Sequence, residues 1–256
     1  GNMKKLITVF TMLGIMGSAS MTQAQDIDTK KLRFGVFVAP TMSWMRPTAN
    51  KSDDNEHLTR NGGSKVGFTY GLMAEYRFAE NYSFVTGLQV NMGGGKITTQ
   101  RDAAPADSAG GFVTATDFSY TLQYLEIPLG LKMRTNLISG VRFFGQLGIT
   151  PAFNISKKVA YSIDSYNGTQ LNRHADENVK LKGALTITPL LFQMNIGVGM
   201  EYPLSDQLCG YVGIFFNNGF APDVTNTVKY NFGQSGTFKD GNVRLNNFAL
   251  SFGLFF

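Results

Sequence analysis

Long segments that alternate between apolar and small or polar residues constrain this chain more than any other feature of its sequence. Over residues 66–78 every even position is apolar or aromatic, and the odd positions carry Gly, Thr, Met, Glu and Arg. Residues 190–202 and 246–256 show the same two-faced pattern. Successive side chains point to opposite faces of a strand, whereas a helix would spread these residues around its circumference. The pattern therefore predicts an all-β chain.

Six weaker segments complete a set of eight predicted strands. The eight are residues 32–42, 66–78, 82–92, 120–133, 141–153, 190–202, 208–216 and 244–256. Each has about 9 to 14 residues, which suits the roughly 9 to 11 that a tilted strand needs to cross the hydrocarbon core of a bilayer. Strands of ordinary soluble proteins average about five or six residues. The lengths therefore favour strands that span a membrane.

The connections between the predicted strands alternate in length. Three are short, residues 79–81, 134–140 and 203–207, and four are long and polar, residues 43–65, 93–119, 154–189 and 217–243. Short turns then share one rim and long loops the other, with both ends of the chain at the short-turn rim. Outer-membrane barrels have this layout, with short periplasmic turns and longer extracellular loops. We therefore expect a single eight-stranded antiparallel up-and-down transmembrane β-barrel.

The second face of the predicted strands is poor in the charged residues that a watery surface would require. Charged residues make up only 16% of the chain, and Gly is frequent at 29. Small residues on that face suit an eight-stranded barrel, whose lumen is just wide enough for its own side chains. An open aqueous channel is therefore not expected.

Six charged residues fall on the predicted lumen face. They are Glu75, Arg77, Glu126, Lys132, Arg142 and Glu201. Because an unpaired internal charge is costly, we expect them to neutralise one another as a structural charge network. The alternative is a conduction path, since ionisable residues inside a membrane are functional candidates by default.

Aromatic residues gather where the predicted strands meet their connections. Tyr76, Phe78, Tyr82, Phe84, Tyr202 and Phe256 belong to the short-turn rim, and Trp44, Phe153 and Phe216 to the other. Amphipathic rings favour the headgroup level of a bilayer, so two aromatic girdles are expected. Phe256 ends an apolar face that resembles the closing strand of a Gram-negative outer-membrane barrel, and we expect it to act as an assembly signal.

Residues 1–24 are predicted to be a secretory signal peptide. A Met-Lys-Lys start precedes an apolar run over residues 6–16 and a stretch of small residues. The run is too short for a membrane-spanning helix, which needs about 20 apolar residues. We place cleavage before Gln25, so that residues 25–256 form the barrel domain. Residues 1–2 stand ahead of the Met and are left aside as a cloning remnant or a misassigned start.

The net charge, the single cysteine and the two histidines argue against several functions. The formal charge is +5, and loss of Lys4 and Lys5 with the signal peptide leaves 5 − 2 = +3, which does not suggest a nucleic-acid partner. The single cysteine, Cys209, cannot form a disulfide within the chain and is interpreted as a packing residue. His57 and His174 stand far apart without metal-ligand spacing, so neither a metal site nor a cofactor is predicted.

Two of the long connections carry further patterns. Gly93-Gly94-Gly95-Lys96 lacks the spacing and the helix of a phosphate-binding loop, so it is interpreted as the start of a loop. Residues 154–189 hold more basic than acidic side chains, an excess that would attract anionic lipopolysaccharide. Because residues 179–188 also alternate, we expect the fifth and sixth predicted strands to extend beyond the membrane as a hairpin.

An outer-membrane enzyme that modifies lipids would need a nucleophile and a base at the outer leaflet. His57 or His174, combined with Ser43, Ser52 or Asp54, would have to supply them. No close spacing among these residues supports a catalytic triad. The chain is therefore predicted not to be an enzyme.

One segment carries a family resemblance. Tyr124-Leu125-Glu126-Ile127-Pro128-Leu129, followed by Gly130-Leu131-Lys132, resembles the "YLEIPL-x-LK" strand of the PorT-like outer-membrane β-barrel family, often labelled porin-family proteins. The resemblance implies an integral outer-membrane protein, with Glu126 and Pro128 in the family's strand motif. PorT itself is associated with a protein-secretion apparatus, which makes a secretion partner an implied role.

These inferences predict a non-enzymatic barrel in the outer membrane that acts by loop-mediated binding or as an envelope or secretion-associated component. The expected partners are outer-membrane lipid and lipopolysaccharide, the barrel-assembly machinery, and envelope or secretion-system proteins. Three alternatives stay open: a narrow channel for small solutes, a lipid-modifying enzyme, and a soluble lipocalin-like carrier.

Overall fold

The computed structural model describes residues 27, 29–47, 57–101, 112–167, 170–180, 186–221, 224–226, 229–230, 238–239 and 243–256. The strands in these ranges are β1 (Leu32–Pro47), β2 (His57–Ala79), β3 (Tyr82–Arg101), β4 (Phe112–Glu126), β5 (Leu129–Arg134), β6 (Arg142–Asn167), β7 (Gln170–Lys180), β8 (Thr186–Ile187), β9 (Leu190–Pro203), β10 (Cys209–Ala221), β11 (Thr225–Asn226), β12 (Lys229–Tyr230), β13 (Phe238–Lys239) and β14 (Val243–Phe255). Within the same ranges, no helix is long and apolar enough to cross a membrane.

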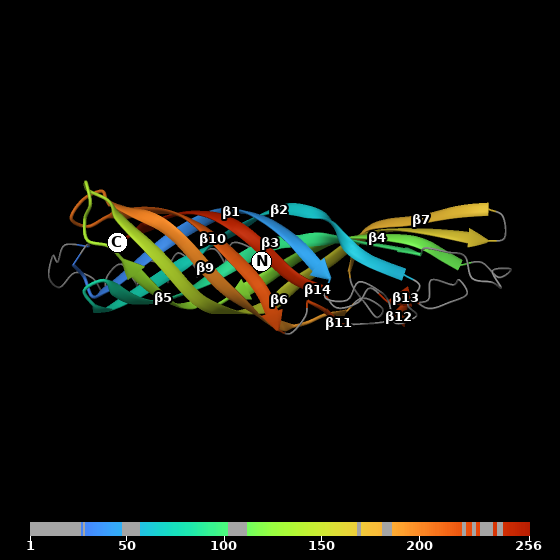
Figure 1. Ribbon diagram of the computed structural model, residues 1–256, viewed down its shortest axis with the longest axis horizontal. Helices are drawn as coiled ribbons and strands as arrows, with labels where there is room; N and C mark the ends of the chain where they lie inside the picture. Colours follow the sequence, from blue (N-terminus) through green and yellow to red (C-terminus); the bar gives the residue numbers. More distant parts are fainter. Residues whose placement is uncertain are drawn as a thin grey trace, which may run out of the picture.

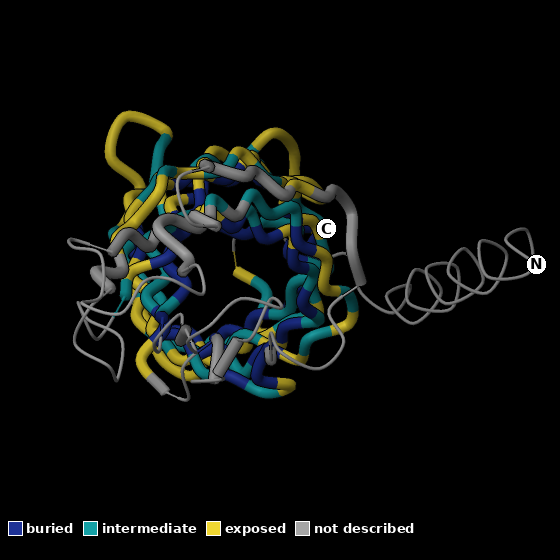
Figure 2. The backbone as a smooth tube through the Cα atoms, turned by 90° about the vertical axis from the view of Figure 1, so that its right-hand side faces the viewer, coloured by how far each residue is buried: buried dark blue, intermediate teal, exposed yellow. Residues whose placement is uncertain are grey.

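One antiparallel sheet closes on itself. Neighbouring strands follow the order β1-β2-β3-β4-β6-β9-β10-β14, and β14 pairs back onto β1. The closing register runs from Gly35 opposite Phe255 to Pro47 opposite Val243. Figure 1 shows the tilted strands from the side, and Figure 2 shows them following one another around a ring. The predicted eight-stranded up-and-down antiparallel barrel is confirmed.

The fourth position of the ring is shared by two strands. The predicted strand over residues 120–133 breaks at Ile127 and Pro128, where β4 ends and before β5 begins. Proline has no N–H to donate, which removes one bond from the ladder. β5 then continues between β3 and β6, with Leu129 opposite both Thr86 and Ile149. The ring therefore keeps eight positions despite the interruption.

Several strands run much farther at the long-connection end than the sequence predicted. β2 begins at His57, β3 reaches Arg101, β4 begins at Phe112 and β6 reaches Asn167. Large parts of the predicted loops 43–65, 93–119 and 154–189 are therefore sheet, and they form the projection on the right of Figure 1. The prediction failed there because polar residues replace the apolar face while backbone pairing continues.

The predicted hairpin beyond the barrel exists, but it uses other residues. β6 and β7 pair from Asn167 opposite Gln170 to Lys158 opposite Lys180. The alternating residues 179–188 do not extend β9, because β8 pairs with β11 instead. The prediction of a projecting hairpin was thus right about its place and wrong about its second strand.

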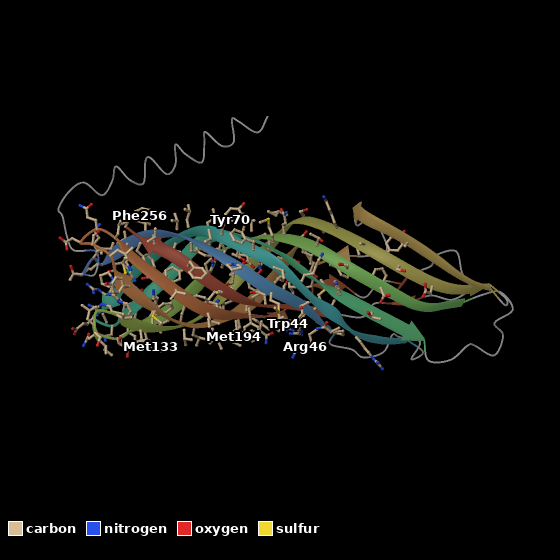
Figure 3. The ribbon with its side chains drawn as sticks, turned by 90° about the horizontal axis from the view of Figure 1, so that it is seen from above. Trp44, Arg46, Tyr70, Met133, Met194 and Phe256 are labelled. Carbon is tan, nitrogen blue, oxygen red and sulfur yellow. The ribbon has the colours of Figure 1, made fainter. Side chains whose placement is uncertain are left out.

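The outer surface of the ring carries a continuous apolar band. Exposed members include Tyr70, Leu88, Leu147, Ile196, Ile214 and Leu250. Figure 3 shows Tyr70, Met133, Met194 and Phe256 projecting from the outside of the barrel, with Trp44 and Arg46 near the start of the projection. Aromatic rings pack at both edges of the band, for example Phe78 on Phe84 at 4.4 Å and Trp44 on Phe248 at 5.4 Å between centroids. The predicted apolar face therefore points outward.

The short-turn end of the lumen is closed by the start of the described chain. Ile27 is fully buried against Cys209 and Phe255, and its amide donates to the Asp206 carbonyl at 2.7 Å. Cys209 is buried and forms no disulfide, as expected of a packing residue. The predicted signal peptide, residues 1–24, lies outside the described residues.

Candidate functional site

The lumen contains three successive layers of different chemistry. A charged layer lies nearest the short turns, a belt of amide side chains lies in the middle, and an apolar layer lies toward the projecting strands. Each layer draws its side chains from the inward positions of several strands, because alternation sends every second residue inside.

Five side chains build the charged layer. Glu75 Oε2 lies 2.7 Å from Arg33 Nη2, and Glu75 Oε1 lies 2.5 Å from Lys132 Nζ. Glu201 Oε1 lies 2.5 Å from both Arg33 Nη2 and Lys132 Nζ, and its Oε2 lies 3.0 Å from Arg134 Nη1. All five residues are buried, and Glu201 is 0% exposed. The layer is therefore a single interlocked network drawn from β1, β2, β5 and β9.

Aromatic rings complete the charged layer. Arg33 Cζ lies 3.9 Å from the centre of the Phe255 ring, and Lys132 Nζ lies 4.3 Å from the centre of the Phe144 ring. Cations held over ring faces gain further electrostatic stabilisation, which grows when water is excluded. Because each isolated ion would be costly to bury, these charges are tolerated as a set.

The structure unites three of the six predicted lumen charges. Glu75, Lys132 and Glu201 meet in the charged layer. Arg77 and Arg142 lie nearer the short-turn rim. Arg142 is the first residue of β6, and Arg77 comes just before the end of β2 at Ala79. Arg77 donates to the Thr29 carbonyl and Arg142 Nη1 donates to the Thr135 carbonyl, the latter at 3.0 Å. Arg142 is also the register partner of Glu201 in the β6–β9 pairing, so the membership of Arg77 and Arg142 in the charge network stays a prediction.

The sequence prediction missed two members of the charged layer. Arg33 shares the inward parity of Gly35 on β1, and Arg134 shares that of Lys132 on β5. The predicted strand over residues 120–133 ended one residue too early and assigned Arg134 to a turn. The alternation of inward and outward positions would therefore have identified both Arg33 and Arg134 as inward residues.

Glu126, the sixth predicted charge, belongs to the middle layer. It is 2% exposed and accepts hydrogen bonds from Gln89 Nε2 at 2.8 Å and Asn91 Nδ2 at 3.3 Å. Thr69 Oγ1 extends this group by donating to Asn91 Oδ1 at 3.2 Å. In the described part of the chain, Glu126 makes no ion pair. Neutral amide donors are thus what holds this carboxyl group.

A chain of amides crosses the opposite wall of the middle layer. Gln146 Nε2 donates to Asn195 Oδ1 at 3.1 Å, Asn195 Nδ2 donates to Asn217 Oδ1 at 2.7 Å, and Asn217 Nδ2 donates to Asn247 Oδ1 at 2.8 Å. The four residues come from β6, β9, β10 and β14. Each inner amide both donates and accepts, which satisfies its buried polar groups and ties four strands together.

The charged layer and the amide belt enclose a small cavity. Its volume is about 90 Å³, and Glu126, Gln89, Asn195, Asn217 and Lys132 contribute to its lining. A polar space of this size holds only a few water molecules, since each needs roughly 10 to 15 Å³ by the same measure. The cavity offers room for water and no bound solute of drug size.

The third layer is apolar and closes the lumen toward the projection. Its largest buried side chains are Met45, Ile97, Phe118, Tyr120, Leu122 and Leu191. Ile187 and Val224, next to the short strands β8 and β11, are buried in the same cluster. The two ends of the lumen are thus closed by opposite chemistry.

The Gly93-Gly94-Gly95 motif lies inside β3 and does not start a loop, which corrects the sequence interpretation. The Gly94 amide donates to Ser43 Oγ at 3.0 Å, so β3 comes against β1 at this point. A Cβ on Gly94 would meet the Tyr120 carbonyl oxygen at 1.9 Å, and one on Gly95 would meet the Met45 nitrogen at 2.7 Å. The glycines therefore permit a close backbone approach, which side chains would prevent.

Of the predicted catalytic candidates, the structure describes Ser43 and the backbones of His57 and His174. His57 lies on β2 opposite Arg101, and His174 lies on β7 opposite Ile163, with β3, β4 and β6 between the two strands. The side chains of both histidines, and the whole of Ser52 and Asp54, lie outside what is described. Ser43 faces inward, where its Oγ donates to the Lys65 carbonyl at 3.3 Å. Across the described ranges, no group of three His, Cys, Asp or Glu side chains suits a metal ion.

Comparisons with known proteins add a family assignment. The family model described as Outer membrane protein beta-barrel domain matches residues 23–220. No curated protein matches the sequence. Similar solved structures include Neisserial surface protein A, with 15% identity, coverage of 88% of this chain and 96% of that chain, and a TM-score of 0.39. OprG from Pseudomonas aeruginosa shows 13% identity, coverage of 88% and 94%, and a TM-score of 0.43. Ail of Yersinia pestis shows 11% identity, coverage of 89% and 100%, and a TM-score of 0.37.

Proposed function

Because this chain belongs to the outer membrane protein beta-barrel domain family, we propose that it is a binding protein that acts from the extracellular side of the outer membrane through its projecting sheet. The location in the outer membrane follows from the family. Barrels of this kind place short turns in the periplasm and long connections outside, so the projection is assigned to the cell surface.

The projecting sheet is the observation that carries the proposal. β2, β3, β4, β6 and β7 continue the barrel wall as one paired sheet beyond the apolar band. A sheet that is already ordered loses little conformational entropy on binding, in contrast to a mobile loop. A rigid surface of this kind suits recognition, whereas anchoring alone would require only short connections.

A groove across the projection supports a saccharide-bearing ligand. Its volume is about 700 Å³, and its lining includes Lys96, Thr98, Asp117, Ser119 and Ser162. Thr98 Oγ1 donates to Asp117 Oδ1 at 2.9 Å, which fixes the carboxylate within the groove. Hydroxyl groups beside one acid and one base match the donors and acceptors of a sugar. We therefore propose lipopolysaccharide, the glycolipid of the surrounding leaflet, as the ligand.

A narrow channel is the second candidate, because the polar belt around Glu126 would suit small solutes. Two features argue against it. The charged layer interlocks across the lumen, and the apolar layer closes the other end. A solute would have to displace both. The closed-lumen binding protein is therefore preferred.

The protein is further proposed not to be an enzyme. The separation of β2 from β7 by three strands supports this, since it keeps the backbones of His57 and His174 apart. Membership of the PorT-like family, which would imply a secretion-system partner, is also a proposal. It is supported by the Tyr124 to Lys132 segment, in which Pro128 stands at the break between β4 and β5.

The binding proposal is tested by shortening the projection. Residues 162–175 would be replaced by Asn-Gly, which joins Tyr161 to Asp176, its partner in the β6–β7 register. The shortened protein is expected to keep heat-modifiable gel mobility and to retain much less lipopolysaccharide in detergent, measured by mass spectrometry of the purified complex. Equal retention by the intact and shortened proteins would contradict the proposed function.

A further inference from the structure

Three lysines lie near one another in the sheet where the apolar band ends. They are Lys65 on β2, Lys96 on β3 and Lys158 on β6, and none of them is buried. On β4 the outward residues change from Leu125 to Gln123 and Thr121. This change from apolar to polar marks the headgroup level of the bilayer. The lysines therefore lie where lipid headgroups lie.

Lys65 reaches β4 by passing across the glycines of β3. Its Nζ donates to Thr121 Oγ1 at 2.6 Å and to the Tyr120 carbonyl at 3.1 Å. Gly94 and Gly95 are the β3 residues opposite Thr121 and Tyr120, and they offer no side chain in the way. The regular β2–β3 register is also interrupted between Gly63 and Phe68. The glycine motif thus lets a β2 lysine cross a whole strand.

Lys158 and Lys96 flank the same threonine. Lys158 is the register partner of Thr121, so their Cβ atoms are about 5 Å apart on one face of the sheet. Lys96 is the partner of Ser119 and hence a diagonal neighbour of Thr121, at roughly 7 to 8 Å, within reach of a long side chain. Thr121 is therefore bonded to the ammonium group of Lys65, and the side chains of Lys96 and Lys158 start within reach of it.

The nearest acid to this lysine cluster, defined as Lys65, Lys96 and Lys158, is Asp117, a diagonal neighbour of Lys96 whose carboxylate accepts a hydrogen bond from Thr98. None of the three makes an ion pair within the described ranges. Lys65 lies just beyond Val66, the last outward apolar residue of β2, and burial together with the charge of Lys96 lowers its pKa. Three positive charges beside a single acid leave an excess that favours an external anion.

We propose that the lysine cluster and the Thr121 hydroxyl form a binding site for a phosphate group, carried by a lipid headgroup or free in solution. Thr121 Oγ1 already accepts from Lys65, which leaves its own proton to donate to a phosphate oxygen. Ammonium groups are common phosphate binders, and three of them match an anion with several oxygens. The inference rests on the proposed function, because Lys96 also lines the saccharide groove.

The test uses the mature protein in detergent and native mass spectrometry with three probes. These are bisphosphorylated lipid A, the same lipid after phosphatase treatment, and inorganic phosphate alone. The combined variant Lys65→Gln, Lys96→Gln and Lys158→Gln is compared with Lys157→Gln, which removes one charge from the adjacent position of β6. Lys157 is opposite the buried Leu122 and so belongs to the other face of the sheet.

The combined variant is expected to bind phosphorylated lipid A at least about tenfold more weakly, since charge-assisted hydrogen bonds are lost, while Lys157→Gln binds like the wild type. A loss of similar size with inorganic phosphate alone would assign the site to the free ion, and a loss with the lipid only would assign it to the headgroup. Lysine-dependent binding of the dephosphorylated lipid, or equal losses in the combined variant and Lys157→Gln, would overturn the phosphate site.

Two controls keep the outcome interpretable. Heat-modifiable mobility reports whether each variant folds. If the combined variant does not fold, the exposed single substitution Lys158→Gln is used in its place, and it is expected to weaken binding by a smaller factor. If the combined variant retains phosphorylated lipid A normally while the shortened hairpin loses it, the phosphate site is wrong and the proposed function stands. If neither change affects retention, both are wrong.

Discussion

The two ends of the lumen are closed in contrasting ways. At the periplasmic end, Glu201 is held by three cations from two strands, one of the cations 168 positions away in sequence. At the extracellular end, Leu122 and Leu191 pack within a cluster of apolar and aromatic side chains. Ion networks require every partner, whereas apolar packing tolerates changes of similar volume. The periplasmic layer should therefore be fragile to single changes, and the extracellular layer more tolerant.

The largest effect is expected for Glu201→Gln. The substitution leaves Arg33, Lys132 and Arg134 buried with Glu75 as their remaining carboxylate in the layer, so the free energy of unfolding should fall by about 3 to 5 kcal/mol. Urea titration in lipid vesicles measures this. Glu80→Gln, at an exposed turn on the same side, is the matched control and should change stability by less than about 0.5 kcal/mol. Equal effects would show that the buried ion network is no more sensitive to a single change than an exposed turn.

A smaller effect is expected for Leu122→Ala in the extracellular layer. Loss of buried methyl groups and the cavity left behind should cost about 2 to 4 kcal/mol. Leu122→Met keeps the volume and should cost less than about 1.5 kcal/mol in the same titration. If Leu122→Met were as damaging as Leu122→Ala, packing at this end would be as specific as the ion network.

The amide belt between the two layers should respond less than either. Asn217→Ala breaks two bonds of the amide chain, but water in the adjoining cavity can satisfy the partners, Asn195 and Asn247, in part. We expect a loss of about 1 kcal/mol. Asn218→Ala, one position along β10, serves as the control with a smaller loss. A cost above that of Leu122→Ala would show that the belt excludes water.

The smallest expected change concerns salt. Buried ion pairs are screened much less than exposed ones, so the stability difference between wild type and Glu201→Gln should stay within about 0.5 kcal/mol from 0.1 to 1 M NaCl. Binding of phosphorylated lipid by the exposed lysine cluster should weaken over the same range. A stability difference that shrinks with salt would mean that water reaches the charged layer.

The parts of the fold that depend on alternation were predictable. Residues 66–78 and 190–202 gave both the strands and the outward face, because hydrocarbon on one side and side-chain packing on the other impose opposite compositions. The closing contact between β14 and β1 followed from the odd and even faces of residues 246–256 and the sorting of the connections. Ring closure was thus implied by local patterns alone.

Other features lay beyond such patterns. The projection was missed because both of its surfaces meet polar or mixed surroundings. The two faces of its strands therefore differ little in composition, although strand pairing continues to Arg101 in β3 and Asn167 in β6. Gly94 was assigned to a loop because the close approach of β3 to β1 depends on packing between strands that are not neighbours in the ring. Neither property is encoded in any one segment.

The candidate site was predictable by half. Glu75, Lys132 and Glu201 were identified because their odd or even positions place them on the inward face of their strands. Which inward charges meet depends on how neighbouring strands are shifted along one another, and this shift cannot be read from alternation. Arg77 shares the face of Glu75 and still bonds at the rim, with the Thr29 carbonyl. The lysine cluster was invisible to parity, since Lys65 reaches Thr121 only through the irregular β2–β3 register.

Electrical recording of the purified protein in planar bilayers tests the closed lumen most directly. With the charged and apolar layers in place, we predict no stable conductance steps at either polarity, in the intact protein and in the shortened hairpin variant alike. Reproducible open steps in the intact protein, abolished by a bulky substitution at Asn217 in the cavity wall, would contradict the account and identify the lumen as a conducting path.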